Sequence, residues 1–443
     1  MAASAGWKML SRVLASDVYS CGRFGIHVLP CRFMSATSVP HIKNVREQLK
    51  ELAGAQKQWG GERADRSGLY TQLVHSQTQL TPRTMKESYQ EALIPLSSKP
   101  EIQEKYINWF KTIRIGKLLE DLDTFAVWIS YQHNNRDELK SPLVIVTALV
   151  DRIDLHEGTI CADSDIKMTG HVTWAGKTSM EVTMKLKQLK QDSWSDILQA
   201  TFVMVARDPG NKGAAYVNPL RPETPEEEMI FQEGEVSKVN RKKEVDESLL
   251  KTAPTAEERE LIHQMFVDSL DEQTMSFGAR TKDEGSVWME HTKLKNLLIC
   301  FPQERNLYNK IFGGFLMRKA TELAWANACM HSRKTPSFRA IDDIWFRKPV
   351  EVGSILLLLS EIAYTEGDFM QIRVHAQVVD HKTNKADTTN IFHFTLSCSG
   401  DVPPVVPKTY GESMLYLDGR RHFKEFMRTG IIDKVEETLG TGE

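Results

Sequence analysis

Residues 297–331 read LLICFPQERNLYNKIFGGFLMRKATELAWANACMH, and the rest of the chain is organised around them. The apolar run 297–301 has the length of a strand, and a polar loop carrying Asn306 follows it. Gly313-Gly314 then precede an alanine-rich segment, and alanine is the best helix former. Because the first amides of a helix have no partner within it, these glycines would present N–H groups to a partly negative ligand.

The same pattern occurs 198 residues upstream. Average composition would give roughly one or two identities over residues 108–133 at this offset. The observed identities are Asn108/Asn306, Ile113/Ile311, Gly116/Gly314, Leu118/Leu316, Ala126/Ala324 and His133/His331. They predict a duplicated unit, and two copies suit a pseudo-two-fold pair of domains better than a solenoid.

Composition excludes several classes of protein. A chain of 443 residues with 41% hydrophobic and 26% charged residues has the size and make-up of two or three globular domains. The net charge of −3 gives no reason to expect a nucleic-acid partner, and without an apolar run of ~20 residues no membrane span is expected. The six cysteines include no CxxC pair, which predicts a reducing compartment, no zinc site and no disulfide framework. No metal and no cofactor are expected.

The N-terminus differs from the rest of the chain. Residues 1–40 contain four basic residues and a single acid, Asp17, among serines and apolar residues. This composition is typical of a mitochondrial transit peptide, which we predict for residues 1–34. The alternative is a disordered tail that happens to be poor in acids.

The remaining chain divides into two similar units. Each has a strand, a loop, one long helix and about four strands, which predicts an α+β fold in which a curved antiparallel sheet wraps a central helix. The central helices are expected at 115–133 and 314–331. The strands after them are expected at 143–150, 159–168, 180–188 and 197–206, and at 338–346, 354–364, 369–380 and 389–398. Gly158, Gly170 and Gly176 are expected to separate strands of the first set.

These patterns set the predicted limits of the parts. Thr224 and Thr255 each begin a capping box within a charged connector, whose run at 241–244 we interpret as solvated surface. The predicted parts are 35–84 (extension), 85–209 (first domain), 210–290 (connector), 291–400 (second domain) and 401–443 (tail with a helix).

Three stretches carry a resemblance to a known family. They are GKLLEDLD at 116–123, Asn306 with NKIFGG at 309–314, and FRKPVEVG at 346–353. Over about residues 85–400 the chain resembles the double-hotdog acyl-coenzyme A thioesterases. The resemblance implies two tandem hotdog domains forming a pseudo-dimer. It also implies hydrolysis of fatty acyl-CoA to fatty acid and CoA, an oligomer of such chains, and a location in the mitochondrial matrix or at the inner membrane.

The family uses an aspartate from one hotdog and an asparagine from the other. The aspartate position falls on Asp123 in the first unit and on Thr321 in the second, and the asparagine position on Asn306 and Asn108. Only the pairing of Asp123 with Asn306 has both groups. The resemblance therefore implies one active site per chain, at the interface of the two domains.

The residues suit this chemistry. Asp123 lies at the edge of the apolar stripe of its helix, and a part-buried acid tends toward the raised pKa of a base. The amides of Gly313 and Gly314 are candidates for an oxyanion site, and Asn306 for holding the carbonyl or the water. Arg347 and Lys348 are a looser prediction for contacts to the CoA phosphates.

Each of these residues has an ordinary alternative. Asp123 would be a solvated acid like its neighbours Glu120 and Asp121, Asn306 would turn its own loop, and Gly313-Gly314 would only permit close packing. Arg347 and Lys348 would be surface charges. His133 and His331, at the ends of the central helices, are interpreted as cations favoured by the helix C-terminus.

Two other functions remain open. A hotdog hydratase or dehydratase would want a histidine in the loop before the helix, and neither loop has one. A non-catalytic acyl-CoA binder or scaffold would not need both Asp123 and Asn306. A serine hydrolase is disfavoured because the chain has no G-x-S-x-G motif.

Overall fold

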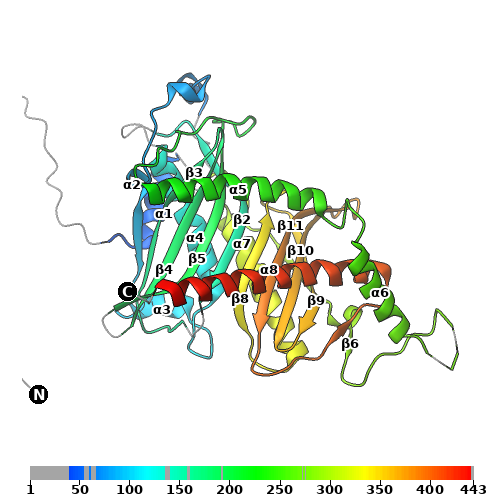
Figure 1. Cartoon of the computed structure of the whole chain (residues 1–443). Helices are drawn as coiled ribbons and strands as arrows, with labels where there is room; N and C mark the ends of the chain where they lie inside the picture. Colours follow the sequence, from blue (N-terminus) through cyan, green and yellow to red (C-terminus); the bar gives the residue numbers. More distant parts are fainter. Residues whose placement is uncertain are drawn as a thin grey trace, which may run out of the picture. The chain divides into compact units, whose positions relative to one another are not determined.

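The computed structural model describes residues 39–443, apart from 54–58, 61–65, 135–139, 157–159, 191–192, 272, 275 and 441–443, and side chains of the last helix as far as Thr429. Residues 39–443 form one compact unit (Figure 1). The predicted transit peptide lies outside the described residues. None of the helices in the described part of the chain is long and apolar enough to cross a membrane.

The first repeat contains a long central helix, α4, flanked by strands. Its elements are β1 (Gln90–Ile94), α3 (Pro100–Tyr106), α4 (Ile115–His133), β2 (Val144–Leu155), β3 (Ile166–Ala175), β4 (Ser179–Lys190) and β5 (Ser193–Arg207). The predicted helix at 115–133 is confirmed. Leu118, Leu122, Phe125 and Ile129 recur every three or four residues and are fully buried, so this stripe fixes which side of α4 faces the sheet.

The second repeat has the same order of elements. They are β7 (Leu294–Ile299), α7 (Gly313–Ser332), β8 (Ser337–Trp345), β9 (Ile355–Glu366), β10 (Phe369–Val379) and β11 (Ala386–Ser397). All the strands predicted here are confirmed to within a few residues. Most positions of β9 and β10 alternate between buried and half-buried, as expected of strands with one face on the core.

The two repeats share one antiparallel sheet of ten strands. Its order is β1-β3-β4-β5-β2-β8-β11-β10-β9-β7, so that β2 of the first repeat pairs with β8 of the second. Leu149 lies opposite Trp345 and Ile153 opposite Ile341 across this junction. The central helices α4 and α7 pack on one face of this shared sheet (Figure 1), which confirms the predicted α+β fold of two repeats that each wrap a central helix.

The two central helices approach closely near their N-termini. A Cβ atom on Gly116 would lie 3.1 Å from Cα of Arg318, and one on Gly314 would lie 2.7 Å from Cα of Glu120. These two pairs are related by the same offset of 198 residues, so the contact has the predicted pseudo-two-fold symmetry. Glycine is needed at both positions because a side chain would push the helices apart.

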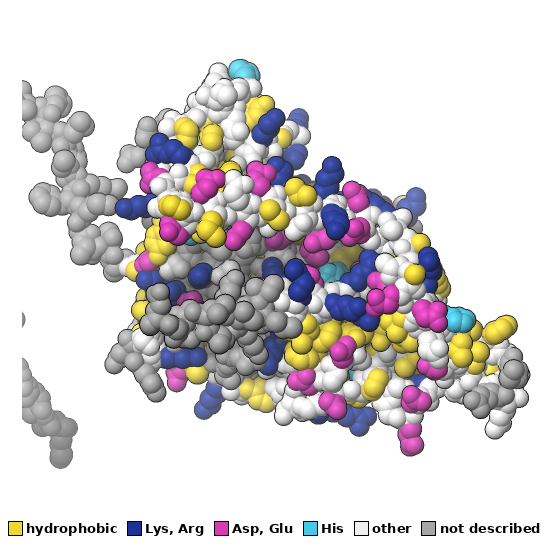
Figure 2. All heavy atoms as spheres, viewed as in Figure 1, with side chains coloured by type: hydrophobic (Ala, Val, Ile, Leu, Met, Phe, Trp, Pro, Cys, Tyr) yellow, Lys and Arg dark blue, Asp and Glu magenta, His cyan; other side chains and the backbone are white. Residues whose placement is uncertain are grey.

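Two further helices cross the other face of the sheet. They are α5 (Pro225–Glu247) and α8 (Tyr410–Gly440), and Figure 1 shows both running across the strands. Thr224 and Thr255 cap α5 and α6 (Ala256–Asp268) as predicted, although only Thr255 forms the full capping box. On the face seen in Figure 2, acidic and basic side chains are interspersed over α5 and the described part of α8.

Smaller elements complete the described chain. They are α1 (Ile42–Leu52), α2 (Met85–Ser88), the 3-10 turns Ser67–Gln72, Gln77–Gln79, Met289–Thr292 and Pro302–Glu304, and a parallel pair, β6 (Val287–Trp288) with β12 (Val405–Val406). Val45 and Leu49 lie one turn apart on α1, and both are buried.

Two sequence interpretations are wrong. Gly170 was expected to end a strand at 159–168, but it lies inside β3, which begins only at Ile166. A Cβ atom there would come within 2.9 Å of both Met184 on β4 and Ile129 on α4, so this glycine admits the helix rather than a turn. The charge run at 241–244 is not wholly solvated, because Arg241 is 9% exposed and pairs with Glu181 and Asp151 of the sheet.

Candidate active site between the central helices

Asp123 lies where α4 meets the N-terminus of α7. Its Oδ2 accepts the backbone N–H of Gly314 at 2.7 Å, and its Oδ1 accepts the hydroxyl of Thr147 on β2 at 2.5 Å. The residue is 2% exposed. A carboxylate is favoured at a helix N-terminus, where unpaired N–H groups carry partial positive charge. The alternative of a solvated helix acid is therefore wrong for Asp123.

Burial governs the protonation of this carboxyl group. Loss of hydration raises the pKa of Asp123 to about 6, while the hydrogen bonds from Thr147 and Gly314 act in the opposite direction. The group is consequently charged at neutral pH but close enough to its pKa to accept a proton, as a general base must.

The neighbouring acids are also buried, contrary to the interpretation of Glu120 and Asp121 as solvated. Glu120 pairs with Arg318 of α7, with 2.7 Å between Oε1 and Nε, and with Lys117. Asp121 pairs with Arg46 of α1 at 2.8 Å. Both acids have basic partners, whereas the partners of Asp123 are neutral donors.

The glycine pair lets α7 approach this carboxylate. A Cβ atom on Gly313 would lie 3.0 Å from Oδ2 of Asp123 and 3.0 Å from the ring of Phe346. Gly314 gives its N–H to Asp123, so the structure assigns that amide a different partner from the predicted oxyanion. As the first residue of α7, Gly313 has no acceptor for its own N–H within the helix.

Asn306 shapes the loop that precedes α7. Its Oδ1 accepts the N–H groups of Tyr308 at 2.9 Å and Lys310 at 3.1 Å, so the loop-turning alternative is correct for this oxygen. The hydroxyl of Tyr308 bonds to that of Tyr131, which anchors the loop on α4 about two turns beyond Asp123. Within the described part of the chain, Nδ2 of Asn306 has no hydrogen-bond partner.

The equivalent loop of the first repeat has the same construction. Oδ1 of Asn108 accepts the N–H groups of Phe110 at 3.0 Å and Thr112 at 3.1 Å. Its Nδ2, however, donates to the hydroxyl of Thr112 at 2.8 Å, and Lys310 occupies the position equivalent to Thr112. The oxygens of the two asparagines therefore accept equivalent hydrogen bonds in their loops, but only the amide NH₂ of Asn306 is available to a ligand.

Thr321 occupies the position of Asp123 in the second repeat. It is buried, and its hydroxyl donates to the carbonyl of Met317 one turn earlier in α7, at 2.7 Å. Neither the acid nor the free amide is present on this side.

The remaining predicted residues lie beside the site. Arg347 and Lys348 directly follow Phe346, whose ring contacts Gly313, and both are exposed. Lys348 pairs with Asp387 at 3.1 Å, between two side chains that are more than half exposed. Such an ion pair contributes little and is easily exchanged for another anion.

Comparison with known proteins gives a consistent result. The chain is 53% identical over 398 residues to mitochondrial acyl-coenzyme A thioesterase 9 of Homo sapiens, covering 89% of this chain and 91% of that protein. The chain belongs to the acyl-coenzyme A thioesterase family. Further relatives are acyl-coenzyme A thioesterase 10 of Mus musculus (49% over 389 residues; 87% and 89%) and thioesterase 4 of Humulus lupulus (34% over 364 residues; 77% and 67%).

Two solved structures align with parts of the chain. An acyl-CoA hydrolase of Staphylococcus aureus, in complex with butyryl-CoA and CoA, covers 35% of this chain and 99% of its own, with 24% identity and a TM-score of 0.33. A putative oleoyl thioesterase of Lactobacillus plantarum covers 70% of this chain and 95% of its own, with 10% identity and a TM-score of 0.42. No family model matches the chain.

The names of the three relatives above include the word mitochondrial, which supports a mitochondrial location for this member of the thioesterase family.

Thr147 was missed in the sequence because a threonine in a strand carries no signal of its own. Only the packing of β2 against α4 brings it to Asp123. The predicted limits of the domains stay predictions.

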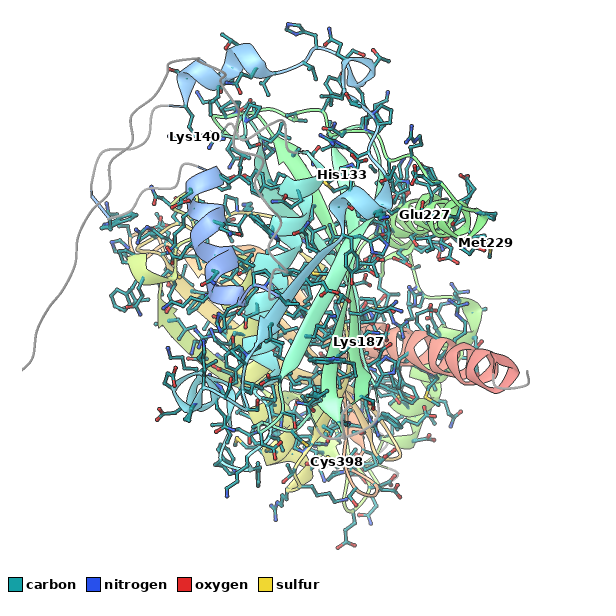
Figure 3. The ribbon with its side chains drawn as sticks, turned by 90° about the vertical axis from the view of Figure 1, so that its left-hand side faces the viewer. His133, Lys140, Lys187, Glu227, Met229 and Cys398 are labelled. Carbon is teal, nitrogen blue, oxygen red and sulfur yellow. The ribbon has the colours of Figure 1, made fainter. Side chains whose placement is uncertain are left out.

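The interpretation of the two repeat histidines as cations is wrong. Burial lowers the pKa of His133 to about 4 and also lowers the pKa of His331. Nε2 of His133 lies 2.9 Å from the carbonyl of Asn218, and that of His331 lies 2.8 Å from the carbonyl of Pro403. Both rings are thus neutral links between the end of a central helix and a returning segment; His133 is marked in Figure 3.

Proposed function

We propose that the chain hydrolyses fatty acyl-CoA to a fatty acid and CoA at one site, formed by Asp123 of the first repeat and the Asn306 loop and α7 N-terminus of the second. The observation that carries this proposal is the carboxylate of Asp123, buried and held by neutral donors where two helices meet. A base with a pKa near 6 is charged at neutral pH and can accept a proton from water.

In this mechanism Asp123 accepts a proton from a water that attacks the thioester carbonyl. The carbonyl oxygen becomes negative as the tetrahedral intermediate forms and needs donors aimed at it. The N–H of Gly313, the free amide of Asn306 and the positive end of α7 supply them, while the N–H of Gly314 keeps Asp123 in place. The proton on Asp123 then passes to the departing CoA thiolate.

Arg347 and Lys348 are proposed to contact the CoA phosphates. Their support is their position next to Phe346, which lines the glycine pair, and the exposed pairing of Lys348 with Asp387 that a phosphate would replace. Charge reversal at either residue should raise KM for acyl-CoA and leave kcat largely unchanged.

The experiment that tests the site compares Asn306→Ala with Asn108→Ala. Each change removes the same pair of loop hydrogen bonds to Oδ1, and Asn108→Ala also removes the bond from Nδ2 to Thr112, so Asn108→Ala should lose at least as much stability. Only Asn306→Ala removes an available amide, and kcat should fall roughly 10- to 1000-fold, the scale of losing one polarising donor. Thr321→Ala should leave the rate nearly unchanged.

Rates are compared at temperatures equally far below each melting temperature, on a series of acyl chain lengths. Equal losses in Asn306→Ala and Asn108→Ala would show that the amide acts only in the loop. A greater loss in Thr321→Ala would place the active half-site on the other side. A binder or scaffold would show no turnover in the unmodified chain.

A homo-oligomer in the mitochondrial matrix completes the proposal. The oligomer is supported by exposed apolar side chains at the edge of the sheet: Leu297 and Ile299 lie on the edge strand β7, and Phe301 follows it. Such an edge commonly pairs or is covered. Light scattering on Leu297→Lys should show a smaller particle than that of the unmodified chain.

A further inference from the structure

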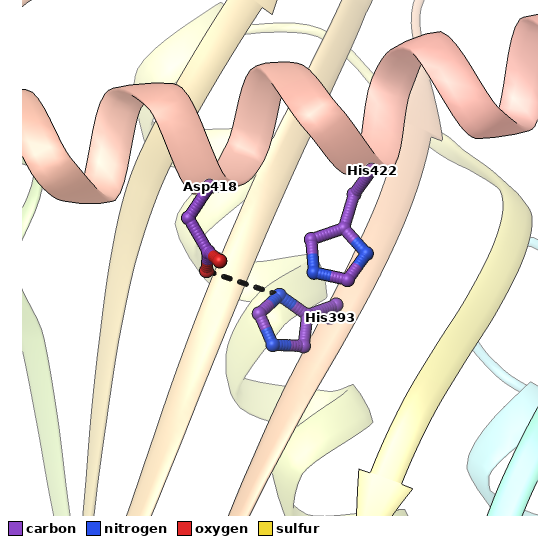
Figure 4. Close-up of side chains that lie close together, drawn as sticks. All are labelled: His393, Asp418 and His422. Atoms are coloured by element: carbon purple, nitrogen blue, oxygen red, sulfur yellow. Dashed lines mark ion pairs between the residues drawn. The ribbon is translucent and has the colours of Figure 1, made fainter. Parts of the chain in front are cut away.

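Two histidines and an aspartate meet on the face of the sheet opposite the central helices. His393 points outward from β11, and Asp418 and His422 lie one turn apart on α8 (Figure 4). One ligand atom from each residue can be chosen so that the three lie within 4.8 Å of one another. The rings of His393 and His422 stack with their centres 3.9 Å apart.

Helix spacing and strand pairing bring these three side chains together. Residues four apart on a helix lie on the same side, so Asp418 and His422 both face the sheet. His393 is opposite Asp342 of β8 in the strand pairing, and the same row continues to Arg373 of β10. The cluster therefore lies over the junction between the two repeats, on the face opposite Asp123.

Within the described part of the chain, the acidic side chains around the cluster are paired with its histidines and not with lysine or arginine. Three carboxylates surround the rings: Asp418, Asp342 at 3.2 Å from Nδ1 of His422, and Asp343 at 3.9 Å. Among the described residues, none of these three acids pairs with a lysine or arginine. The nearby Arg373 is already paired with Glu361 at 3.3 Å.

Two details of the geometry favour a bound cation. Nδ1 of His393 and Oδ2 of Asp418 are 3.9 Å apart, too far for a hydrogen bond but suited to a small ion between them. The buried Oδ1 atom of Asp342 has no hydrogen-bond partner among the described residues, while its Oδ2 holds Nδ1 of His422. A carboxylate on the far nitrogen of a histidine is the usual support for a metal ligand.

We propose that His393, Asp418 and His422 bind a divalent transition-metal ion of the zinc type, with Asp342 orienting His422. Imidazole and carboxylate ligands suit zinc, and three protein ligands leave a fourth position for water. Tetrahedral bonds of about 2.1 Å place ligand atoms about 3.4 Å apart, so the side chains must close by roughly 1 Å. The ion would tie α8 to β11.

The experiment measures zinc binding to the purified full-length chain after chelator treatment and dialysis. We expect one tightly bound zinc per chain, and Co²⁺ in its place should give the intense visible absorption of four-coordinate cobalt. Asp418→Asn keeps the shape of the side chain and should abolish this binding, as should His393→Ala. Asp342→Asn should weaken it by about 10- to 100-fold, the effect of losing an orienting partner.

His375→Ala is the matched control. His375 is a half-buried strand histidine on β10 that bonds to Thr388 and lies outside the cluster, so its loss should leave zinc binding unchanged. The four described free cysteines can also take up zinc, but such binding would persist in Asp418→Asn.

The melting temperature gives a second readout. Added zinc should raise it in the unmodified chain and in His375→Ala, and not in Asp418→Asn. The proposal is overturned if the unmodified chain takes up no added zinc after the chelator treatment, which would mean that a proton on His422 alone balances the carboxylates. It is equally overturned if Asp418→Asn, folded by circular dichroism, binds zinc as tightly as the unmodified chain.

Discussion

Replacing Thr147 by valine should move the pH dependence of hydrolysis without removing it. The hydroxyl of Thr147 donates to Oδ1 of Asp123 at 2.5 Å, and valine has the same shape without the donor. This bond stabilises the charged carboxylate, so its loss must raise the pKa of Asp123. Hydrogen bonds to charged groups contribute about 1.5–3 kcal/mol, which corresponds to a rise of roughly 1–2 pKa units.

The size of the effect on rate follows from the starting value. With the pKa of Asp123 at about 6, about nine-tenths of the chains carry the active carboxylate at pH 7. A pKa of about 7.5 would leave about one quarter of them active, a three- to fourfold loss at pH 7 that disappears near pH 9.

The assay is kcat/KM for acyl-CoA between pH 5 and pH 9, which reports titration of the free enzyme. Thr173→Val is the control, because Thr173 is a buried threonine of β3 that bonds to Thr183 away from the site. The reasoning is refuted if the acidic limb of Thr147→Val coincides with that of the unmodified chain, even if the rate is uniformly lower.

Three further outcomes follow from the same structure. Asp123→Asn should abolish hydrolysis yet stabilise the fold. Folding raises the pKa of Asp123, so the unfavourable buried charge appears as pH rises from 4 through 6. The gain in the free energy of unfolding should reach up to about 3 kcal/mol above pH 7 and vanish below pH 4, as chemical denaturation at both pH values would show. Gly314→Ala should separate α4 from α7 and cost both stability and rate, whereas Gly68→Ala, in open space, should cost neither; equal melting temperatures would contradict this. Protein isolated from mitochondria should begin near Ser35, and an intact Met1 in the mature pool would disprove the predicted cleavage.

Much of the fold could be predicted because it depends on local patterns. The stripe of Leu118, Leu122 and Ile129 determines the helix and its buried side, and the offset of 198 residues reveals the duplication. The prediction that Gly170 separates two strands was wrong because the sequence does not show whether a glycine forms a turn or makes room for a neighbouring helix. That distinction depends on which element packs above the strand.

The site was predictable only in part, for the same reason. Asp123 could be placed by its position on the helix stripe, but its partners come from residues 24 and 191 positions away in the chain. Arg241 reads as part of a solvated charge run until the sheet supplies Glu181 and Asp151 beneath it. The proposed metal cluster carries no sequence signal beyond the spacing of Asp418 and His422.

The junction of β2 with β8 has a consequence for how the activity depends on concentration. In a pair of separate subunits, a site made from both would be lost on dilution. Here the connector holds the halves in one chain, so their association is intramolecular and its effective concentration is fixed by the tether. Because each half is also encoded separately, a substitution in one half is not repeated in the other, and Thr321 and Asp123 can differ within a single molecule.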